Sequence, residues 1–530
     1  MNLLKAPWIP VRADGGAGAF CLLTYQQLLC EPGNWQVSLP RDDLELACVQ
    51  LLVCMTQVMF MPEGDPSSDP NGNKALRARI TKPLSSDEFD KGIAPCNRKG
   101  EEWFDLDHPT QPFMQSRKVT GKLTSVQKLL PGLPEKTSTA PGAHCFFNEV
   151  TEARHISGAV AAIALFNQAT NCPSFGGGFK GSLRGGAPIT TLVFGNGLRE
   201  IVWRNVLTRP RIEQRQIKML GFDRDQPTWV KPIQEATINW NEIGLVRGLF
   251  WQPARVELVK SKMVAPCDVL GGEAVPVYTG FRCEKFSFTV KGVWPHPHGA
   301  MTKSLKKGDP KKGEPEKKLE EKFASFTTTA PAWTQLSEFV IPRSINDENA
   351  KEGSVPAGPI TQANELADGP LHLLVGGYRT KQASVLERRH DMISLAHGWQ
   401  DDKGRLPKLV EIGKEAVDLL KARLRDASKG YKNKKKNIKL KGIGAAIHET
   451  AEKMFYAQTE SLIRETFSKK DTFSQWADAR RSFAIKMAEL CEDIFEKLTD
   501  PYAMKPELIP AIAWARRSLN TDLKKLKEGA

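Results

Sequence analysis

From about residue 405 onward, hydrophobic residues recur at intervals of three and four, the spacing of one face of an α-helix. Four such stretches follow one another with short polar links between them. Their recurring apolar residues are Leu409, Ile412, Ala416 and Leu419; Ile447, Ala451 and Met454; Phe483, Met487, Leu490 and Ile494; and Leu508, Ile512, Ala515, Leu519 and Leu523. Helices of this kind bury their apolar faces against one another. The pattern therefore predicts a four-helix bundle over residues 401–530.

Residues 1–400 show no single dominant period. A long apolar stretch at 44–60 predicts a helix, and Pro/Gly-rich connections separate shorter apolar runs of strand length. These runs lie at 189–194, 286–290 and 371–375. The sequence thus predicts an α+β fold: a large mixed α/β domain with long loops over residues 1–400, followed by the C-terminal four-helix bundle.

One stretch of the first domain lacks apolar residues almost entirely. Residues 301–322 form a Lys/Glu/Gly/Pro tract, MTKSLKKGDPKKGEPEKKLEEK. Such a composition buries too little surface to offset its ordering entropy. We expect a mobile surface loop.

The apolar stretch Ala47–Met61 is interrupted by Gln50, Thr56 and Gln57 and is shorter than the roughly 20 residues that a spanning helix needs. We expect a buried helix and no membrane partner. We expect no secretion signal, because the first residues contain no continuous apolar run and no small-residue cleavage site. The ten cysteines include no C-x-x-C pair, which is typical of reduced thiols in a cytoplasmic protein.

Charge changes this picture. The net charge of +14 and a pI near 9.2 favour a polyanionic partner. The last 130 residues hold 28 Lys and Arg against 20 Asp and Glu, and Lys421–Lys441 alone holds ten basic residues and one acid. A solvated face is one explanation. A contact with nucleic-acid phosphates is the one we favour, with Lys432, Lys434, Lys435 and Lys436 as candidates.

The segment Ser174–Pro188 is rich in glycine. Gly176, Gly178 and Gly181 fit G-x-G-x-x-G, but a dinucleotide site needs a helix directly afterwards and a P-loop needs G-K-[ST]. No cofactor is therefore expected. Glycine still lets the backbone approach a flat or charged ligand closely, with Lys180 and Arg184 as flanking positive charges. A merely flexible loop is the alternative.

Two other motifs suggest chemistry only weakly. His296 and His298 are two imidazoles without an accompanying Cys, Asp or Glu cluster, so zinc is not expected. Glu387–Asp391 (ERRHD) is more typical of an ion-paired turn or helix than of acid–base catalysis. Neither motif offers a nucleophile or a metal partner, and the sequence predicts no active site.

Taken together, the chain resembles the large subunit (CasA) of the type I-E CRISPR surveillance complex, Cascade. The resemblance extends over nearly the whole length and is carried by long segments in one order. These are MNLL…WIPVR (1–12), SLPRDDLELA (38–47), HPTQPFMQ (108–115), AIALFNQA (162–169), FGGGFKGSLRGG (175–186), QPTWVKPI (226–233), GLVRGLFWQPA (244–254), EKFSFTVKGVWPHPH (284–298), GGYRTKQAS (376–384) and LERRHD (386–391).

The resemblance implies a non-catalytic subunit that recognises a protospacer-adjacent motif (PAM) in duplex DNA from the minor groove, while guide RNA pairing reads the rest. It places the glycine loop at Gly176, Gly177 and Gly178, with Gly177 against a base edge. It assigns a lysine finger to Lys285. A glutamine wedge falls at Gln382, supported by Ala383, and unstacks the first target pair.

The family also implies partners. They are the guide CRISPR RNA, double-stranded target DNA, the other Cascade subunits and a helicase-nuclease that the bundle helps to recruit. A loop with Phe146, Phe147 and Asn148 resembles the contact with guide RNA and neighbouring subunits, although local core packing would also explain it. A basic RNA- or protein-binding scaffold without motif reading, and a nuclease with a hidden site, stay open as alternatives.

The sequence departs from the family pattern at two places. Lys381 stands before the wedge where an Asn is usual, and an ammonium donates hydrogen bonds but cannot accept them. Some members carry two C-x-x-C pairs that resemble a zinc site, whereas the stretches 157–160 and 265–272 retain only Cys267. We therefore expect changed motif selectivity and no metal.

Overall fold

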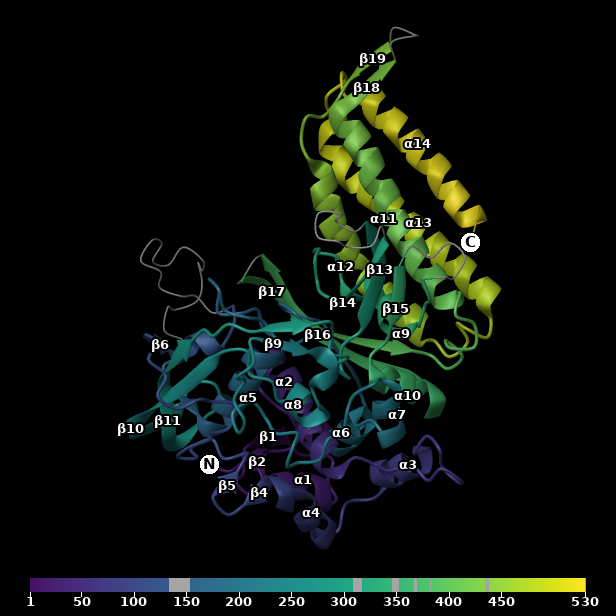
Figure 1. Cartoon of the computed structure of the whole chain (residues 1–530). Coiled ribbons are helices and arrows are strands. Elements are labelled where there is room, and N and C mark those ends of the chain that lie inside the picture. Colours follow the sequence, from purple (N-terminus) through teal and green to yellow (C-terminus); the bar gives the residue numbers. More distant parts are fainter. Residues whose placement is uncertain are drawn as a thin grey trace. The chain divides into compact units, whose positions relative to one another are not determined.

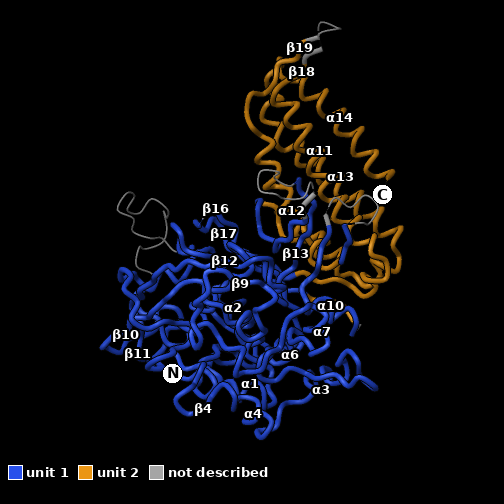
Figure 2. Tube along the Cα trace, in the orientation of Figure 1, with its two compact units in different colours: residues 1–328, 342–367, 373–392 blue, residues 329–341, 368–372, 393–530 orange. Residues whose placement is uncertain are grey.

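The computed structural model (Figure 1) describes residues 1–132, 153–307, 317–345, 352–366, 369–381, 383–433 and 438–529. The chain divides into two compact units, coloured separately in Figure 2. Unit 1 comprises residues 1–328, 342–367 and 373–392, and unit 2 comprises 329–341, 368–372 and 393–530. Helices and strands are mixed, as predicted.

Two apolar helices lie in the core of unit 1. Helix α2 (Asp42–Phe60) contacts α5 (Gly158–Thr170), and most side chains of both are buried. α2 is long and apolar enough to cross a membrane, yet 83% of its most apolar window is buried inside the unit. Burial on all sides explains why its sequence is apolar around the whole helix. The helix predicted at 44–60 is confirmed.

Shorter helices surround these two. In unit 1 they are α1 (Tyr25–Cys30), α3 (Asn73–Thr81), α4 (Ser86–Ile93), α6 (Leu198–Asn205), α7 (Arg209–Gln214), α8 (Leu245–Leu249) and α10 (Gly358–Leu366). Single 3₁₀ turns occur at Asp14–Gly16, Ala94–Cys96, Val126–Leu129 and Trp240–Glu242. Local sequence sets several of these starts: Thr24 and Ser85 each form a capping box with the residue three positions later, which satisfies two helix N–H groups.

Unit 1 contains several small sheets rather than one large one. Their strand orders are β2 (Phe20–Leu23), β1 (Ile9–Arg12), β3 (Gln36–Val37); β10 (Arg255–Cys267), β11 (Gly271–Glu284), β6 (Leu123–Ser125), with β7 (Ile156–Ser157) also on β11; β12 (Thr289–Lys291), β9 (Thr237–Asn239); β14 (Lys317–Phe323), β13 (Met301–Lys307), β15 (Glu352–Val355); β17 (Ser384–Leu395), β16 (Leu371–Lys381), β8 (Thr190–Val193); and β4 (Asn97–Arg98), β5 (Glu101–Glu102).

The predicted strands fare differently. β8 and the start of β16 confirm those at 189–194 and 371–375, and the two strands pair antiparallel. The run at 286–290 is only partly a strand, because β12 begins at Thr289. Phe286 and Phe288 instead pack together with ring centroids 5.1 Å apart, and Phe288 also contacts Trp251. Aromatic packing, not strand pairing, explains the apolar character of that run.

The prediction of a mobile loop at 301–322 is wrong for its two ends, which form the antiparallel strands β13 and β14. Cross-strand ion pairs join Lys303 to Glu321 and Lys306 to Glu320, both at 2.6 Å. β13 also pairs with β15 from residues 352–355. Ion pairs between β13 and β14, together with the pairing of β13 with the distant strand β15, stabilise this tract. Its composition alone had predicted a loop.

Unit 2 contains the four helices predicted from the sequence. They are α11 (Arg405–Lys429), α12 (Ile447–Ser468), α13 (Trp476–Ala503) and α14 (Ile509–Glu528), with α11 in contact with each of the others. A short hairpin of β18 (Gly430–Asn433) and β19 (Ile438–Lys441) joins α11 to α12. The unit also includes a 3₁₀ turn (Ala332–Gln335) and α9 (Leu336–Val340) from earlier in the chain.

Candidate nucleic-acid interface

The glycine-rich loop follows directly on the buried helix α5. The chain leaves that helix with the backbone N–H groups of Asn171 and Cys172 both donating to the Asn167 carbonyl, at 2.8 and 3.1 Å. The Gln168 side chain donates to the Pro173 carbonyl at 3.0 Å. These contacts fix the base of the loop to the core helix, so its exposed end starts from a rigid support.

Aromatic side chains on both sides of the glycines fix the loop a second time. Phe175 and Phe179 meet edge to face with centroids 5.6 Å apart, and Phe175 also packs on the buried Phe281 of β11 at 5.5 Å. The Phe179 N–H closes a turn by donating to the Gly176 carbonyl at 2.9 Å. Between the two phenylalanines, Gly177 and Gly178 are exposed, whereas Gly176 and both aromatic side chains are half-buried. Sequence reasoning did not recognise this anchor, although the flanking aromatics were visible.

The three glycines differ in what they require. Gly176 and Gly178 have φ of +93° and +87°, values that residues with a Cβ adopt at a cost. A Cβ on Gly178 would lie 3.4 Å from Lys285 Nζ, whereas one on Gly177 would meet nothing within 4 Å. Gly177 is therefore open to solvent, and Lys285, which directly follows β11, lies beside the loop.

Ala383, which lies between β16 and β17, is also close to the glycine loop. A Cβ on Gly176 would lie 4.0 Å from the Ala383 Cβ, and Lys381 ends β16 with an exposed side chain. Behind this contact, Cys172, Ala187 and Tyr378 form a small buried cluster with Val385 packed on it. The structure thus places Lys285 and Ala383 beside the glycine loop. Lys381 lies two residues before Ala383, at the end of β16, and Gln382 lies outside the described residues.

Three exposed ammonium groups surround this surface, on Lys180, Lys285 and Lys381. Within the described part of the chain, none of them has a carboxylate partner, in contrast to Arg379, which pairs with Glu387 at 2.8 Å. Unpaired cations beside exposed backbone make a site for a polyanion.

Arg184 does not belong to this charged surface. Its side chain is buried, and it donates to Thr190 Oγ1, to the Thr170 carbonyl and to Asn171 Oδ1 at 2.9, 3.1 and 2.5 Å. The interpretation of Arg184 as a flanking charge of the loop is therefore wrong. The buried guanidinium instead stabilises the interior of the segment, because three oxygen atoms from Thr170, Asn171 and Thr190 accept its hydrogen bonds. These acceptors could not be recognised from the sequence.

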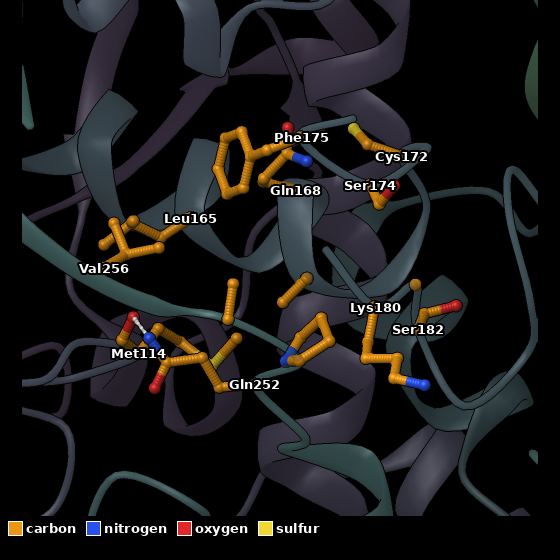
Figure 3. A pocket seen from close by; sticks show the side chains of 14 residues that line it. Met114, Leu165, Gln168, Cys172, Ser174, Phe175, Lys180, Ser182, Gln252 and Val256 are labelled. Carbon is orange, nitrogen blue, oxygen red and sulfur yellow. Dashed lines mark hydrogen bonds between the residues drawn. The ribbon is translucent and has the colours of Figure 1, made fainter. Parts of the chain in front are cut away.

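The pocket beside the loop is too small for a nucleotide. Figure 3 shows its lining, with Leu165 and Gln168 from α5 and Phe175, Lys180 and Ser182 from the glycine-rich segment. Its volume is about 20 Å³, whereas small-molecule sites usually measure about 300–1,000 Å³. A nucleic acid would contact the outer face of the loop and not this interior.

The remaining chemical motifs have structural explanations. His296 and His298 are buried, and desolvation with nearby Arg184 lowers the pKa of His298 to about 3. The ion pairing predicted for Glu387–Asp391 is confirmed, because Arg379 and Arg389 pair with Glu387. The prediction of a turn or helix is wrong, because the segment lies in strand β17. The described residues contain no group of three His, Cys, Asp or Glu side chains that could hold a metal.

The stretches 157–160 and 265–272, in which some family members are expected to carry C-x-x-C pairs, do meet in space. The Ser157 N–H donates to the buried Cys267 Sγ at 3.3 Å, and β7 pairs with β11 beside it. Asp268 accepts from the backbone N–H groups of Arg154 and His155, both at 2.7 Å. Hydrogen bonds join these two stretches.

The basic run of unit 2 is only partly free to bind an anion. Lys421 pairs with Glu452 and Arg423 with Asp426 and Asp522, within 2.7 to 2.8 Å. Arg425, Lys429 and Lys439 are exposed. Of the candidates, Lys432 has its backbone in β18, and Lys434, Lys435 and Lys436 lie outside the described residues, as do Phe146, Phe147 and Asn148. The first part of the run, up to Lys429, is the end of α11, and the second part pairs as β18 and β19, a hairpin that the sequence pattern did not predict.

Comparison with known proteins agrees with this architecture. The family model for CRISPR-associated protein Cse1 matches residues 2–494. Cse1 from Acidimicrobium ferrooxidans is 16% identical, with a TM-score of 0.69 over 100% of this chain and 98% of that one. Cse1 from Thermobifida fusca is 18% identical, with a TM-score of 0.68 over the same shares. A chain of a CRISPR RNA-guided surveillance complex reaches 0.62 at 14% identity, over 98% and 99%. The protein belongs to the Cse1 family of CRISPR-associated proteins.

Proposed function

We propose that this chain is the large subunit of a type I-E Cascade complex, and that it recognises the PAM of duplex DNA from the minor groove without catalysing a reaction. The observation that carries the proposal is that Lys285 and Ala383 lie beside Gly176–Gly178, with the exposed Lys381 two residues before Ala383. Backbone without side chains fits a groove about 6 Å wide. The adjacent ammonium groups suit its negative potential.

In this proposal the three elements act in sequence. Gly177 approaches a base edge, Lys285 donates to minor-groove acceptors, and Gln382 enters the stack and starts unwinding, at a cost of a few kcal/mol that the motif contacts offset. Guide RNA pairing then extends the opening. The other Cascade subunits and the guide RNA hold the chain in place, and the bundle helps recruit the helicase-nuclease. The structural likeness to a chain of a surveillance complex supports this assignment.

The open position of Gly177 allows a direct test. Gly177→Ala adds one methyl group that meets nothing in the free protein, so the fold stays intact while the closest approach to a base edge is blocked. We expect at least a tenfold loss of motif-duplex affinity in the assembled complex, about 1.4 kcal/mol. Gly186→Ala is the matched control, because Gly186 is exposed, has no neighbour within 4 Å and lies in the same segment.

A second pair of variants distinguishes motif reading from a scaffold. Lys285→Ala and Gln382→Ala should each weaken binding to the motif duplex and reduce the preference for the motif over a scrambled one. If neither variant, nor Gly177→Ala, changes motif binding, the chain is a basic RNA- or protein-binding scaffold and the proposal is wrong.

A further inference from the structure

Three buried N–H groups beneath the glycine-rich segment have no acceptor among the described residues. They are Arg184 Nε, Trp251 Nε1 and His296 Nε2. All three residues line one pocket of about 10 Å³, together with Thr170, Ser182 and apolar groups. A pocket of this size holds about one water-sized particle. Three side chains with unsatisfied donors line one small space, which points to a single bound acceptor.

The protonation of His296 follows from its neighbour. The His298 backbone N–H donates to His296 Nδ1 at 3.1 Å, so Nδ1 carries the lone pair and the ring hydrogen is on Nε2. Desolvation, with Arg184 and His298 nearby, lowers the pKa of His296 well below its usual value, which keeps the ring neutral. Nε2 is therefore a hydrogen-bond donor.

Charge points to the kind of acceptor. Arg184 is 4% exposed, and its other N–H groups donate to neutral oxygens only. The buried Nε and Nη2 atoms of Arg215 also have no acceptor among the described residues, and both guanidinium groups depress the pKa of His296. Neither arginine forms an ion pair within the described part of the chain. Burying unpaired cations is costly unless an anion accompanies them.

We propose that this pocket binds a single halide ion, chloride under physiological conditions. A water molecule accepts two hydrogen bonds and would leave one of the three donors unsatisfied. A monatomic anion accepts all three from any direction and also balances the buried guanidinium charge. The pocket excludes phosphate and carboxylates by size.

The site has a structural consequence for the loop above it. The backbone N–H of Arg184 donates to Ser182 Oγ at 3.2 Å, and Ser182 Oγ donates to the Gly185 carbonyl at 2.9 Å. A halide bound to Arg184 therefore holds the turn that follows the glycine loop. The proposed halide site does not depend on DNA recognition, and its experiments do not test DNA recognition.

Crystals of the full chain grown in bromide in place of chloride test the proposal directly. We expect an anomalous difference peak within hydrogen-bond distance of Arg184 Nε, Trp251 Nε1 and His296 Nε2. Electron density for an ordered water without an anomalous peak, or no density, would overturn it.

Unfolding in urea gives an independent measurement. With gluconate replaced by chloride at constant ionic strength, the unfolding constant should fall about 100-fold when chloride reaches 100 times its dissociation constant. Trp251→Phe should lose most of this dependence. Trp203→Phe is the matched control, since Trp203 Nε1 is also buried without an acceptor but does not line the pocket. Equal chloride dependence in both variants contradicts the proposal. If Trp251→Phe does not fold, the bromide experiment on the unaltered chain decides.

Discussion

At the residue scale, the glycine loop shows how the absence of a side chain can serve two purposes, the backbone conformation and access for a ligand. Gly178 has φ of +87° and leaves the space beside it to Lys285, whereas Gly177 has open solvent on its Cβ side. Gly178 is needed by the fold, and Gly177 is available to a ligand. The G-x-G-x-x-G pattern treats them alike, because sequence spacing carries no dihedral angles.

Gly178→Ala should therefore destabilise the protein, by about 1–2 kcal/mol from backbone strain. The Lys285 ammonium is the end of a flexible side chain and would move aside, so the dihedral angle dominates the cost. Gly177→Ala should change the free energy of unfolding by less than about 0.5 kcal/mol. Urea unfolding of the two variants measures this difference. Equal stabilities would show that the positive φ is not required.

The ion pairs of Glu387 predict a pH dependence. Burial raises the pKa of this carboxyl, but the hydrogen bonds and charges of Arg389 and Arg379 outweigh it and lower the pKa below the usual value. The stabilisation is therefore complete above the unfolded pKa of about 4.3 and is lost as pH falls through the lower folded value.

Glu387→Gln should accordingly be less stable than the native chain at neutral pH, and the difference should shrink as pH falls below about 4.3. The midpoint of urea unfolding across a pH series measures it. A difference that stays constant down to pH of about 3 would contradict this assignment of the stabilisation to the charged pair.

At the element scale, two hairpins stand where composition indicated loop or helix. β13 and β14 pair through Lys–Glu contacts, and β18 and β19 join α11 to α12. Tyr431 of the second hairpin packs on Trp514 of α14 with ring centroids 4.3 Å apart. That contact links residues far apart in sequence, which is why local periodicity did not reveal the hairpin.

The lysines that lie between β18 and β19 in the sequence give a prediction about phosphate contact. Replacing Lys434, Lys435 and Lys436 by Gln should flatten the slope of log affinity against log salt by roughly 2–3 units if all three contact phosphates. Duplex binding by the assembled complex at several salt concentrations measures it. The control replaces Lys74, Lys91 and Lys99 of unit 1, with the same loss of charge. Equal slopes for both triple variants would exclude a specific role of the hairpin.

At the scale of the whole molecule, the proposed role is recognition within an assembly. If the chain reads the motif, a complex that lacks it should lose motif-dependent duplex binding but still bind a single strand complementary to the guide, since base pairing carries that step. Gel-shift measurements with both substrates test this. Undiminished duplex binding without the chain would refute its role in motif recognition.

The sequence by itself determined the helical part of the protein and much of its chemical character. The three- and four-residue spacing of α11–α14 and the apolar run of α2 are local signals, and burial of one helix face dictates them directly. Charge indicated a polyanionic partner, and long family segments indicated Cse1.

Tertiary structure decided the rest, because it depends on contacts between distant residues. It buried Arg184 among acceptors from α5 and β8 and paired β13 with β15. It also added residues 329–341 to unit 2. There Trp333 packs so closely on α11 that a Cβ on Gly413 would lie 2.7 Å from it. It also brought Lys285 and Ala383 to the glycine loop. Family resemblance named those residues, but only the fold gives the distances that make them one surface.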